Sequence, residues 1–190
     1  ASGTIAADGV AIDRIDRGTM ARKIAYLPQG QTLHWPLAVE RLVALGRLPH
    51  LGPLSRLTAD DEAAIEDAMV RADVTGFKGR IATELSGGER ARVLLARALA
   101  VGAPALIADE PLAALDPGHQ IDVMALLRAQ AQDGALVVTV LHDLAMAARY
   151  CDRLLLMDGG ALVADGAPMD VLTPERLASV YGAVSYTHLT

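Results

Sequence analysis

The chain has 190 residues, enough for one domain with a sizeable core, and a formal net charge of −6 at pH 7. This acidic balance and the scattered Lys and Arg argue against nucleic acid as a partner, because phosphate backbones bind clustered basic residues. Hydrophobic residues make up 52%, mainly Ala, Leu and Val, which favours a helix-rich α/β protein over an aromatic-rich β-sandwich.

The sequence predicts a soluble, cytoplasmic protein. Cys151 is the single cysteine, which excludes an intrachain disulfide and a thiol-rich metal site and favours a reducing compartment. No apolar run approaches the roughly 20 residues that span a bilayer, and the first residues do not resemble a signal peptide. Any membrane role is therefore expected to come through a partner.

The first quarter of the chain predicts short β segments. Residues 3–13 are typical of a hairpin that turns at Asp8-Gly9. Residues 23–27 predict a strand, which Pro28 ends.

From Leu37 to about Phe77 the pattern is helical. We expect one helix over 38–45, a proline-containing loop over 46–57, and a second helix that begins after Thr58. Thr58 is a good N-cap, and the three acidic residues at 60–62 suit the positive end of a helix dipole.

After Leu85 strands and helices alternate. The expected elements are a helix over 86–100, a strand over 105–108, a helix over 118–132, a strand over 136–141, a helix over 144–150, a hairpin over 153–165 and a last helix from Pro174. The strand at 136–141 is apolar without alternation, as a central parallel strand would be.

Two adjacent carboxylates, Asp109 and Glu110, follow a buried strand and precede Pro111. Parallel-sheet proteins bind ligands at the carboxyl ends of their strands. One carboxylate there is suited to holding Mg²⁺, and its neighbour to orienting an attacking water. Taken alone, the segment is also consistent with a strand that ends in solvated acids.

A capped helix start contains two surplus glycines. Ser86 and Glu89 form a capping box, but Gly87 and Gly88 each cost about 1 kcal/mol of helix stability against alanine, and a cap needs neither. The glycines make sense if another group approaches the backbone closely, and amides at a helix N-terminus bind anions.

Three further polar residues have ordinary structural explanations when taken singly. His142 stands at the end of a second apolar strand, Asp116 before Pro117 is a helix cap, and Gln29 is a loop glutamine.

The order of these segments resembles the ATPases of the ABC transporter family. The resemblance runs from about Gly3 to Gly182, and residues 85–99 (LSGGERARVLLARAL) are its most specific part. It implies that Gln29 is the Q-loop glutamine, which contacts Mg²⁺ and the attacking water. Asp109 would coordinate Mg²⁺, Glu110 would be the general base, and His142 would be the switch histidine that holds the γ-phosphate of ATP.

The resemblance also implies a head-to-tail dimer. In the family, the signature motif binds the γ-phosphate held by the opposite subunit; the matching residues here are Ser86, Gly87, Gly88 and Glu89. Asp116 would be the D-loop aspartate at the dimer interface. Further implied partners are transmembrane permease subunits at the cytoplasmic face of the inner membrane and, indirectly, a substrate-binding protein.

The implied fold is an α/β P-loop NTPase (RecA-like) core with an antiparallel β hairpin and an inserted helical subdomain. The ATPase domain would span residues 1–182, with the antiparallel part at 1–28, the Q-loop and helical subdomain at 29–85, and the core at 86–182. Residues 183–190 fit no pattern; a frayed tail and a segment foreign to the native protein are both open.

One family motif does not occur in this sequence. The phosphate-binding loop Gly-x-x-x-x-Gly-Lys-Ser/Thr requires a Gly-Lys dipeptide, and the chain contains none. In the family this loop and the first core strand precede the part that matches residues 3–13. We therefore expect that the chain begins after both, binds ATP weakly by itself and does not hydrolyse it at a family-like rate.

Residues 43–50 (VALGRLPH) resemble the importer ATPases for ferric siderophores, haem and cobalamin, although Gly-Arg-x-Pro also serves simply to end a helix. Three alternatives stay open: the ATPase of another small-solute or metal importer, an ABC ATPase without a transporter, and a regulatory subunit that binds nucleotide without turnover. Intact Glu110 and His142 argue against the last.

Overall fold

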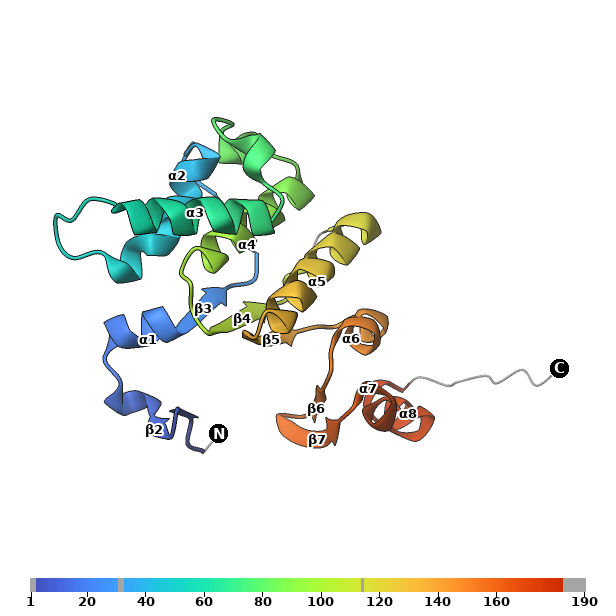
Figure 1. Ribbon diagram of the computed structural model, residues 1–190. Coiled ribbons are helices and arrows are strands. Elements are labelled where there is room, and N and C mark those ends of the chain that lie inside the picture. The colour runs from blue at the N-terminus through green and yellow to red at the C-terminus, as the bar shows by residue number, and fades with distance from the viewer. Residues whose placement is uncertain (1–2, 31–32, 114, 183–190) are drawn as a thin grey trace. The chain divides into compact units, whose positions relative to one another are not determined.

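The computed structural model describes residues 3–30, 33–113 and 115–182, which fall into two compact units, residues 1–140 and 141–190 (Figure 1). In chain order the first unit contains β1 (Ala6–Ala7), β2 (Val10–Ala11), α1 (Arg17–Lys23), β3 (Ile24–Leu27), α2 (Val39–Ala44), α3 (Ala59–Arg71), α4 (Gly87–Leu99), β4 (Ala105–Asp109), α5 (Pro117–Gln132) and β5 (Leu136–Val140). Short 3₁₀ turns lie at Ile12–Arg14, Leu45–His50 (η2), Thr75–Phe77 and Ala82–Glu84.

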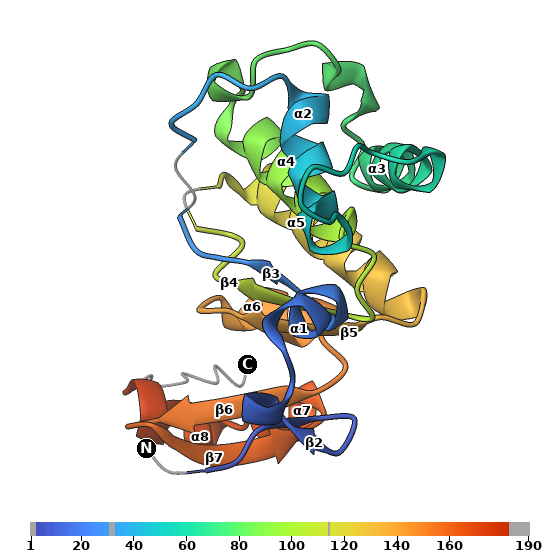
Figure 2. The ribbon, with the colours of Figure 1, turned by 90° about the vertical axis from the view of Figure 1, so that its left-hand side faces the viewer.

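A three-stranded parallel sheet in the order β3-β4-β5 is the centre of the first unit. Figure 2 shows α2, α3, α4 and α5 on one side of this sheet. Leu106 and Ala108 of β4 are buried on that side. The predicted α/β class and parallel pairing are confirmed.

β5 does not have the central position expected of it. Among the residues that the structure describes, only β4 pairs with β5. Leu136, Val138 and Val140 are exposed, Leu136 at 63%, and they share one face of the strand because alternate residues point to the same side. An apolar strand without alternation therefore does not guarantee burial on both faces.

Local signals set the helix starts. The Thr58 hydroxyl accepts a hydrogen bond from the Asp61 amide, and the Asp61 carboxylate accepts one from the Thr58 amide, so α3 begins with a capping box. Helix α1 was not predicted: Asp16 caps it by accepting from the Thr19 amide at 2.9 Å. The turn η2 continues α2 into the stretch expected to be a loop.

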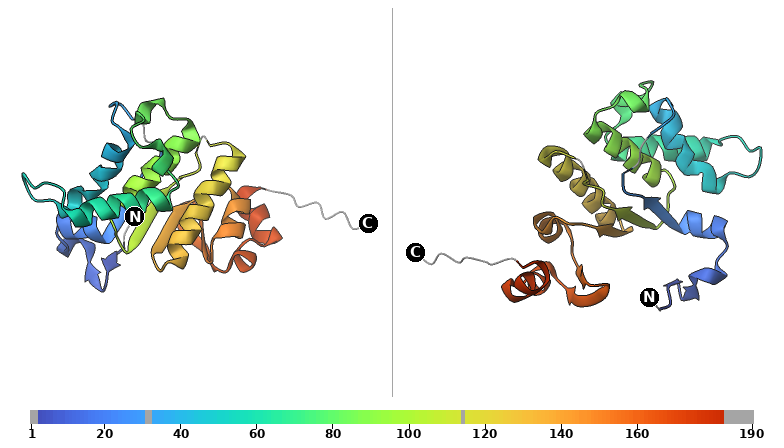
Figure 3. Two further views of the ribbon diagram at one scale, coloured as in Figure 1. Left: turned by 45° about the horizontal axis from the view of Figure 1, so that its top comes forward. Right: turned by 180° about the vertical axis from the view of Figure 1, so that it is seen from behind.

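The buried face of α4 anchors the helical layer. Val93, Leu95 and Ala96 of α4 are fully buried, as are Val43 of α2 and Met69 of α3. Figure 3 (left) shows α4 and α5 side by side across the sheet. The sheet and these helices share one core, which fixes the ends of the strands relative to α4.

The second unit contains α6 (Leu144–Tyr150), β6 (Leu154–Asp158), β7 (Ala161–Gly166), α7 (Pro168–Val171) and α8 (Pro174–Tyr181). The predicted hairpin is confirmed: β6 and β7 pair antiparallel around Gly159 and Gly160. The Arg153 guanidinium donates to both carboxylate oxygens of Asp165, at 2.6 and 2.7 Å. The tail at 183–190 lies outside the described residues.

Candidate functional site

The carboxyl ends of β3 and β4 bring Gln29 to Glu110. Leu27 and Ala108 are paired in the sheet, and each of the two predicted site residues lies two positions after its member of this pair. The Gln29 side-chain amide Nε2 donates a hydrogen bond to Glu110 Oε2, across 81 residues of sequence. An amide donor on a carboxylate restrains its orientation, and a carboxylate held at this edge is suited to accept a proton from water.

Asp109 has a neighbour that sequence reasoning missed. The Tyr26 hydroxyl donates a hydrogen bond to Asp109 Oδ2 at 3.3 Å. Desolvation, and then the negative charge of Asp109, raise the pKa of Tyr26 above its ordinary value. The sheet register brings the two residues together, since Tyr26 pairs with Ile107, two residues before Asp109, and no spacing in the sequence signals this pairing.

The backbone of Glu110 is in the left-handed region, with φ +45°. This conformation is unusual for a residue with a side chain, and it costs on the order of 1–3 kcal/mol. The bend comes directly after Asp109 ends β4, and Pro111 follows. Strain maintained next to two carboxylates is typical of functional sites.

The expected capping box at the start of α4 is confirmed. The Ser86 hydroxyl accepts from the Glu89 amide at 3.3 Å, and Glu89 accepts from the Ser86 amide at 2.8 Å. Arg80 donates to the other carboxylate oxygen of Glu89 at 2.9 Å. The Ser86 amide, followed by Arg80, holds the pKa of Glu89 at about 2, so this carboxylate is committed to the cap. We call residues 86–89 the signature segment.

Gly88 is buried because a side chain of α5 lies against it. A Cβ placed on Gly88 would overlap Cγ, Cδ2 and Nε2 of the His119 ring. Asp116 caps α5, accepting from the His119 amide at 3.2 Å and from His119 Nδ1. These bonds, the one from the His119 side chain first, lower the pKa of Asp116. One of the two surplus glycines is thus explained by close approach within the chain.

A hollow of about 250 Å³ lies between the loop after β3, the start of α4 and Glu110. The loop after β3 contributes Gly30, the start of α4 contributes Gly87 and Arg90, and Glu110 lies in the wall. Within the described residues no three His, Cys, Asp or Glu side chains cluster as they would to hold a metal by themselves. A metal at Asp109 would therefore need ligands from a bound phosphate and water, as Mg²⁺ commonly does.

The far end of α4 is held by the segment that resembles importer ATPases. The Arg47 guanidinium donates to the carbonyls of Ala100 and Val101 at 2.9 and 3.2 Å, and the His50 ring nitrogen Nε2 lies 2.7 Å from the Val101 carbonyl. Arg47 also pairs with Asp61 at 2.8 Å, with side-chain exposures of 12% and 7%. We call this set the C-terminal clamp. It caps α4 and connects it to α3, so Gly-Arg-x-Pro does more than end a helix.

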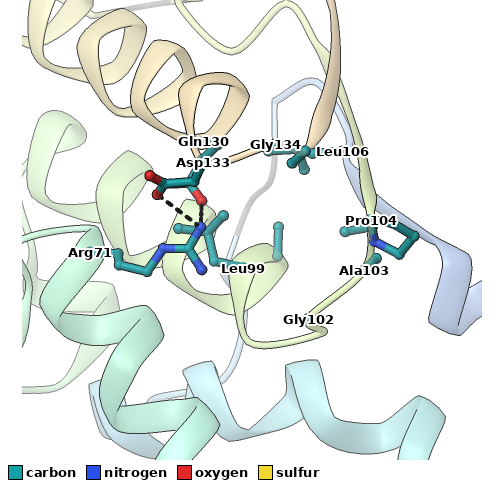
Figure 4. Close-up of a pocket in the computed structure, with 12 residues that line it drawn as sticks. Arg71, Leu99, Gly102, Ala103, Pro104, Leu106, Gln130, Asp133 and Gly134 are labelled. Atoms are coloured by element: carbon teal, nitrogen blue, oxygen red, sulfur yellow. Dashed lines mark hydrogen bonds and ion pairs between the residues drawn. The ribbon is translucent and has the colours of Figure 1, made fainter.

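A second cavity, of about 270 Å³, lies among residues that precede β4 and β5 (Figure 4). It opens at the starts of the strands, and the predicted site residues follow the strand ends. Arg71 donates to the Gln130 side chain there and lies 3.9 Å from an Asp133 carboxylate oxygen. No predicted site residue lines it.

His142, the remaining predicted site residue, belongs to the second unit. It is exposed, and the Asp143 side chain next to it caps α6 by accepting from the Met146 amide at 2.9 Å. The structure therefore brings together Gln29, Asp109 and Glu110 in one cluster, and Asp116 and the signature segment in a second.

A parallel sheet with acidic residues at its carboxyl edge, beside a glycine-rich helix start, is typical of α/β proteins that bind nucleotides at this edge. Residues 1–113 match the ABC transporter family, and the chain belongs to that family. The P-loop NTPase fold is likewise supported by solved ABC ATPases.

Two relatives illustrate the similarity. The chain is 46% identical over 181 residues to the hemin import ATP-binding protein HmuV of Streptomyces coelicolor, covering 95% of this chain and 64% of the relative. It is 41% identical over 184 residues to the cobalamin import ATP-binding protein BtuD of Halobacterium salinarum, covering 96% of this chain and 46% of the relative. The chain thus spans about two thirds of the first relative and about half of the second.

Two solved structures are similar as well. CbiO1 of Clostridium perfringens, part of the ABC transporter complex CbiONQ, superposes with a TM-score of 0.77 at 27% identity, covering 94% of this chain and 71% of that one. A dimeric ATP-binding cassette in a post-hydrolysis state, bound to ADP and Pi, gives 0.70 at 25% identity, covering 88% and 74%.

Proposed function

We propose that this chain forms the catalytic-carboxylate and signature part of an ATP-hydrolysing subunit that drives an ABC importer for haem, cobalamin or an iron chelate. The observation that carries the proposal is the hydrogen bond from Gln29 to Glu110 beside Asp109 at the carboxyl edge of the sheet. The similarity to hemin and cobalamin import proteins supports the cargo class.

In this proposal Glu110 acts as the general base. A water attacks the γ-phosphorus of ATP, the bond to the bridging oxygen breaks, ADP leaves, and Glu110 accepts the proton of the water. Gln29 restrains the Glu110 carboxylate through its amide and offers its carbonyl oxygen as a ligand. Asp109 would hold Mg²⁺, which neutralises phosphate charge when bound. His142 would hold the γ-phosphate.

The signature segment would bind the γ-phosphate of the ATP that a second copy of the chain holds. Gly87 and Ser86 are exposed at the start of α4, where backbone amides and the helix dipole favour an anion. Asp116 would lie at the same head-to-tail interface. Closure of this dimer on ATP and reopening after hydrolysis would drive permease subunits in the membrane, with this protein at the cytoplasmic face. Among the described residues no helix is both long and apolar enough to cross a bilayer.

Glu110→Gln in the full-length gene product tests the base. Loss of a positioned general base should lower kcat by about 10²–10⁴-fold, while ATP binding persists because the amide retains the shape of the side chain. Glu62→Gln, at an exposed position of α3, is the matched control and should hydrolyse ATP like the wild type. Chelation of Mg²⁺ should abolish turnover of the wild type. Unchanged kcat in Glu110→Gln would refute the assignment.

Reconstitution with the permease distinguishes the cargo. ATP-dependent uptake of haem, cobalamin or a ferric siderophore into proteoliposomes would support the proposed importer. Uptake of another solute would assign a different cargo to an importer of the same family. Robust hydrolysis that no permease stimulates would favour an ABC ATPase without a transporter.

A further inference from the structure

We propose that His119 is a positioning residue that couples Asp116 to the signature segment within one chain. The inference rests on the proposed function, because it concerns how one subunit presents its signature segment to the ATP of the other. Its structural part, the contact between His119 and Gly88, can be tested independently of ATP.

The starts of α4 and α5 approach each other closely. Gly88 lies in the first turn of α4 and is buried, although its neighbours Ser86 and Gly87 are exposed. The His119 ring, in the first turn of α5, occupies the space that a side chain at position 88 would need. Helix capping leaves Gly88 unexplained, and this packing explains it.

Asp116 holds the opposite side of the His119 ring. His119 Nδ1 is bonded to Asp116 Oδ2, and the His119 backbone amide donates to Asp116 Oδ1 at 3.2 Å. With Nδ1 engaged, the opposite edge of the ring, Cδ2 and Nε2, is the part that lies against Gly88. The aspartate, the ring and the glycine backbone are therefore in series: hydrogen bonds join Asp116 to His119, and the His119 ring fills the space beside Gly88.

A displacement of Asp116 would be transmitted through His119 to the start of α4. The capping box between Ser86 and Glu89 makes the first turn of α4 stiff, because both ends of the box are hydrogen-bonded. The His119 ring already fills the space beside Gly88. A displaced ring would therefore move the whole first turn of α4, together with the backbone amides exposed there. A contact made by Asp116 with a second subunit would thus align the signature segment at the same time.

A purely structural role makes a different prediction. Asp116 can cap α5 through the backbone amide of residue 119 whatever the side chain there, so the cap should survive substitution. His119→Phe retains a ring of similar size against Gly88 and loses the bond to Asp116. His119→Ala loses both. A residue needed only for packing would tolerate phenylalanine, whereas a coupling residue would not.

Steady-state ATP hydrolysis by the full-length gene product provides the functional test. We expect both His119→Phe and His119→Ala to raise KM for ATP about tenfold, equivalent to about 1.4 kcal/mol, with kcat changed less than about twofold, because uniform binding is lost and the base is untouched. Asp122→Ala is the control, because Asp122 is exposed on α5 three residues after His119. This variant should match the wild type. A wild-type KM in His119→Phe would overturn the coupling.

A stability cycle provides the structural test. Gly88→Ala should lower the urea midpoint in the wild-type background and lower it by less than half as much when His119→Ala is also present, because the overlapping ring is gone. Equal losses in both backgrounds would refute the contact. If the wild type does not hydrolyse ATP, the proposed function fails, and the cycle still decides whether His119 packs on Gly88.

Discussion

Gly46 is the position where a single methyl group should disturb the clamp most. It is buried in η2 against the last turn of α4. A Cβ on Gly46 would overlap the carbonyl oxygen of Arg97 and approach the Ala100 Cβ to 2.9 Å. Because carbon atoms pack at about 3.5–4.0 Å, η2 would have to move by about 1 Å.

That movement carries Arg47 with it. Its guanidinium lies 2.9 Å from the Ala100 carbonyl, and about 1 Å more exceeds hydrogen-bond range. Overpacking costs about 1–3 kcal/mol, and a lost hydrogen bond to a charged group costs about 1.5–3 kcal/mol. Since relaxation shares the two penalties, we expect Gly46→Ala to lower the free energy of unfolding by about 3 kcal/mol.

Urea denaturation followed by circular dichroism measures this loss. Gly76→Ala is the matched control: Gly76 lies in a 3₁₀ turn of the same helical layer, with no atom within 4 Å of an added Cβ. It should be neutral or stabilise by about 0.4–1 kcal/mol, because alanine restricts the unfolded chain. Equal effects of Gly46→Ala and Gly76→Ala would refute the close approach.

Two further predictions concern α4. Since the folded pKa of Glu89 (about 2) is below its unfolded value of 4.5, its bonds stabilise the fold above pH 4.5 and are lost as the pH falls toward 2. Glu89→Gln should therefore flatten the pH dependence of the urea midpoint in that window; an unchanged pH dependence would contradict the contribution of these bonds. Leu95→Ala, at a fully buried position, should cost about 2–5 kcal/mol in the same assay; less than about 1 kcal/mol would contradict its place in the core.

Elements with local signals were predictable from the sequence. The turn at Asp8-Gly9 joins β1 to β2, and Thr58 and Ser86 cap α3 and α4, as predicted. These signals depend on residues within four positions of one another. Helix α1 escaped prediction because it is seven residues long, contains Gly18 and shows no apolar periodicity.

Contacts between distant segments were not predictable. The clamp joins Arg47 to the carbonyl of Ala100, 53 residues away, and Tyr26 meets Asp109 across 83 residues. No spacing in the sequence signals either contact. Likewise, a surplus glycine at position 88 signalled a close neighbour, but only the packing of α5 identifies it as His119. The site roles of the predicted residues came from the order of the motifs, and they stay predictions.

Helix α4 is restrained along its whole length: the capping box and the His119 ring at its start, fully buried Val93, Leu95 and Ala96 in its middle, and the C-terminal clamp at its end. Beyond its first turn, whose amides have no acceptor within the helix, such a segment exchanges its amide hydrogens only when the surrounding unit opens globally. The capping box and the His119 ring restrain the first turn of α4 against local unfolding. Any reorientation of the signature segment has to be a rigid-body rotation of the entire helix, together with the α3 segment fastened to its far end.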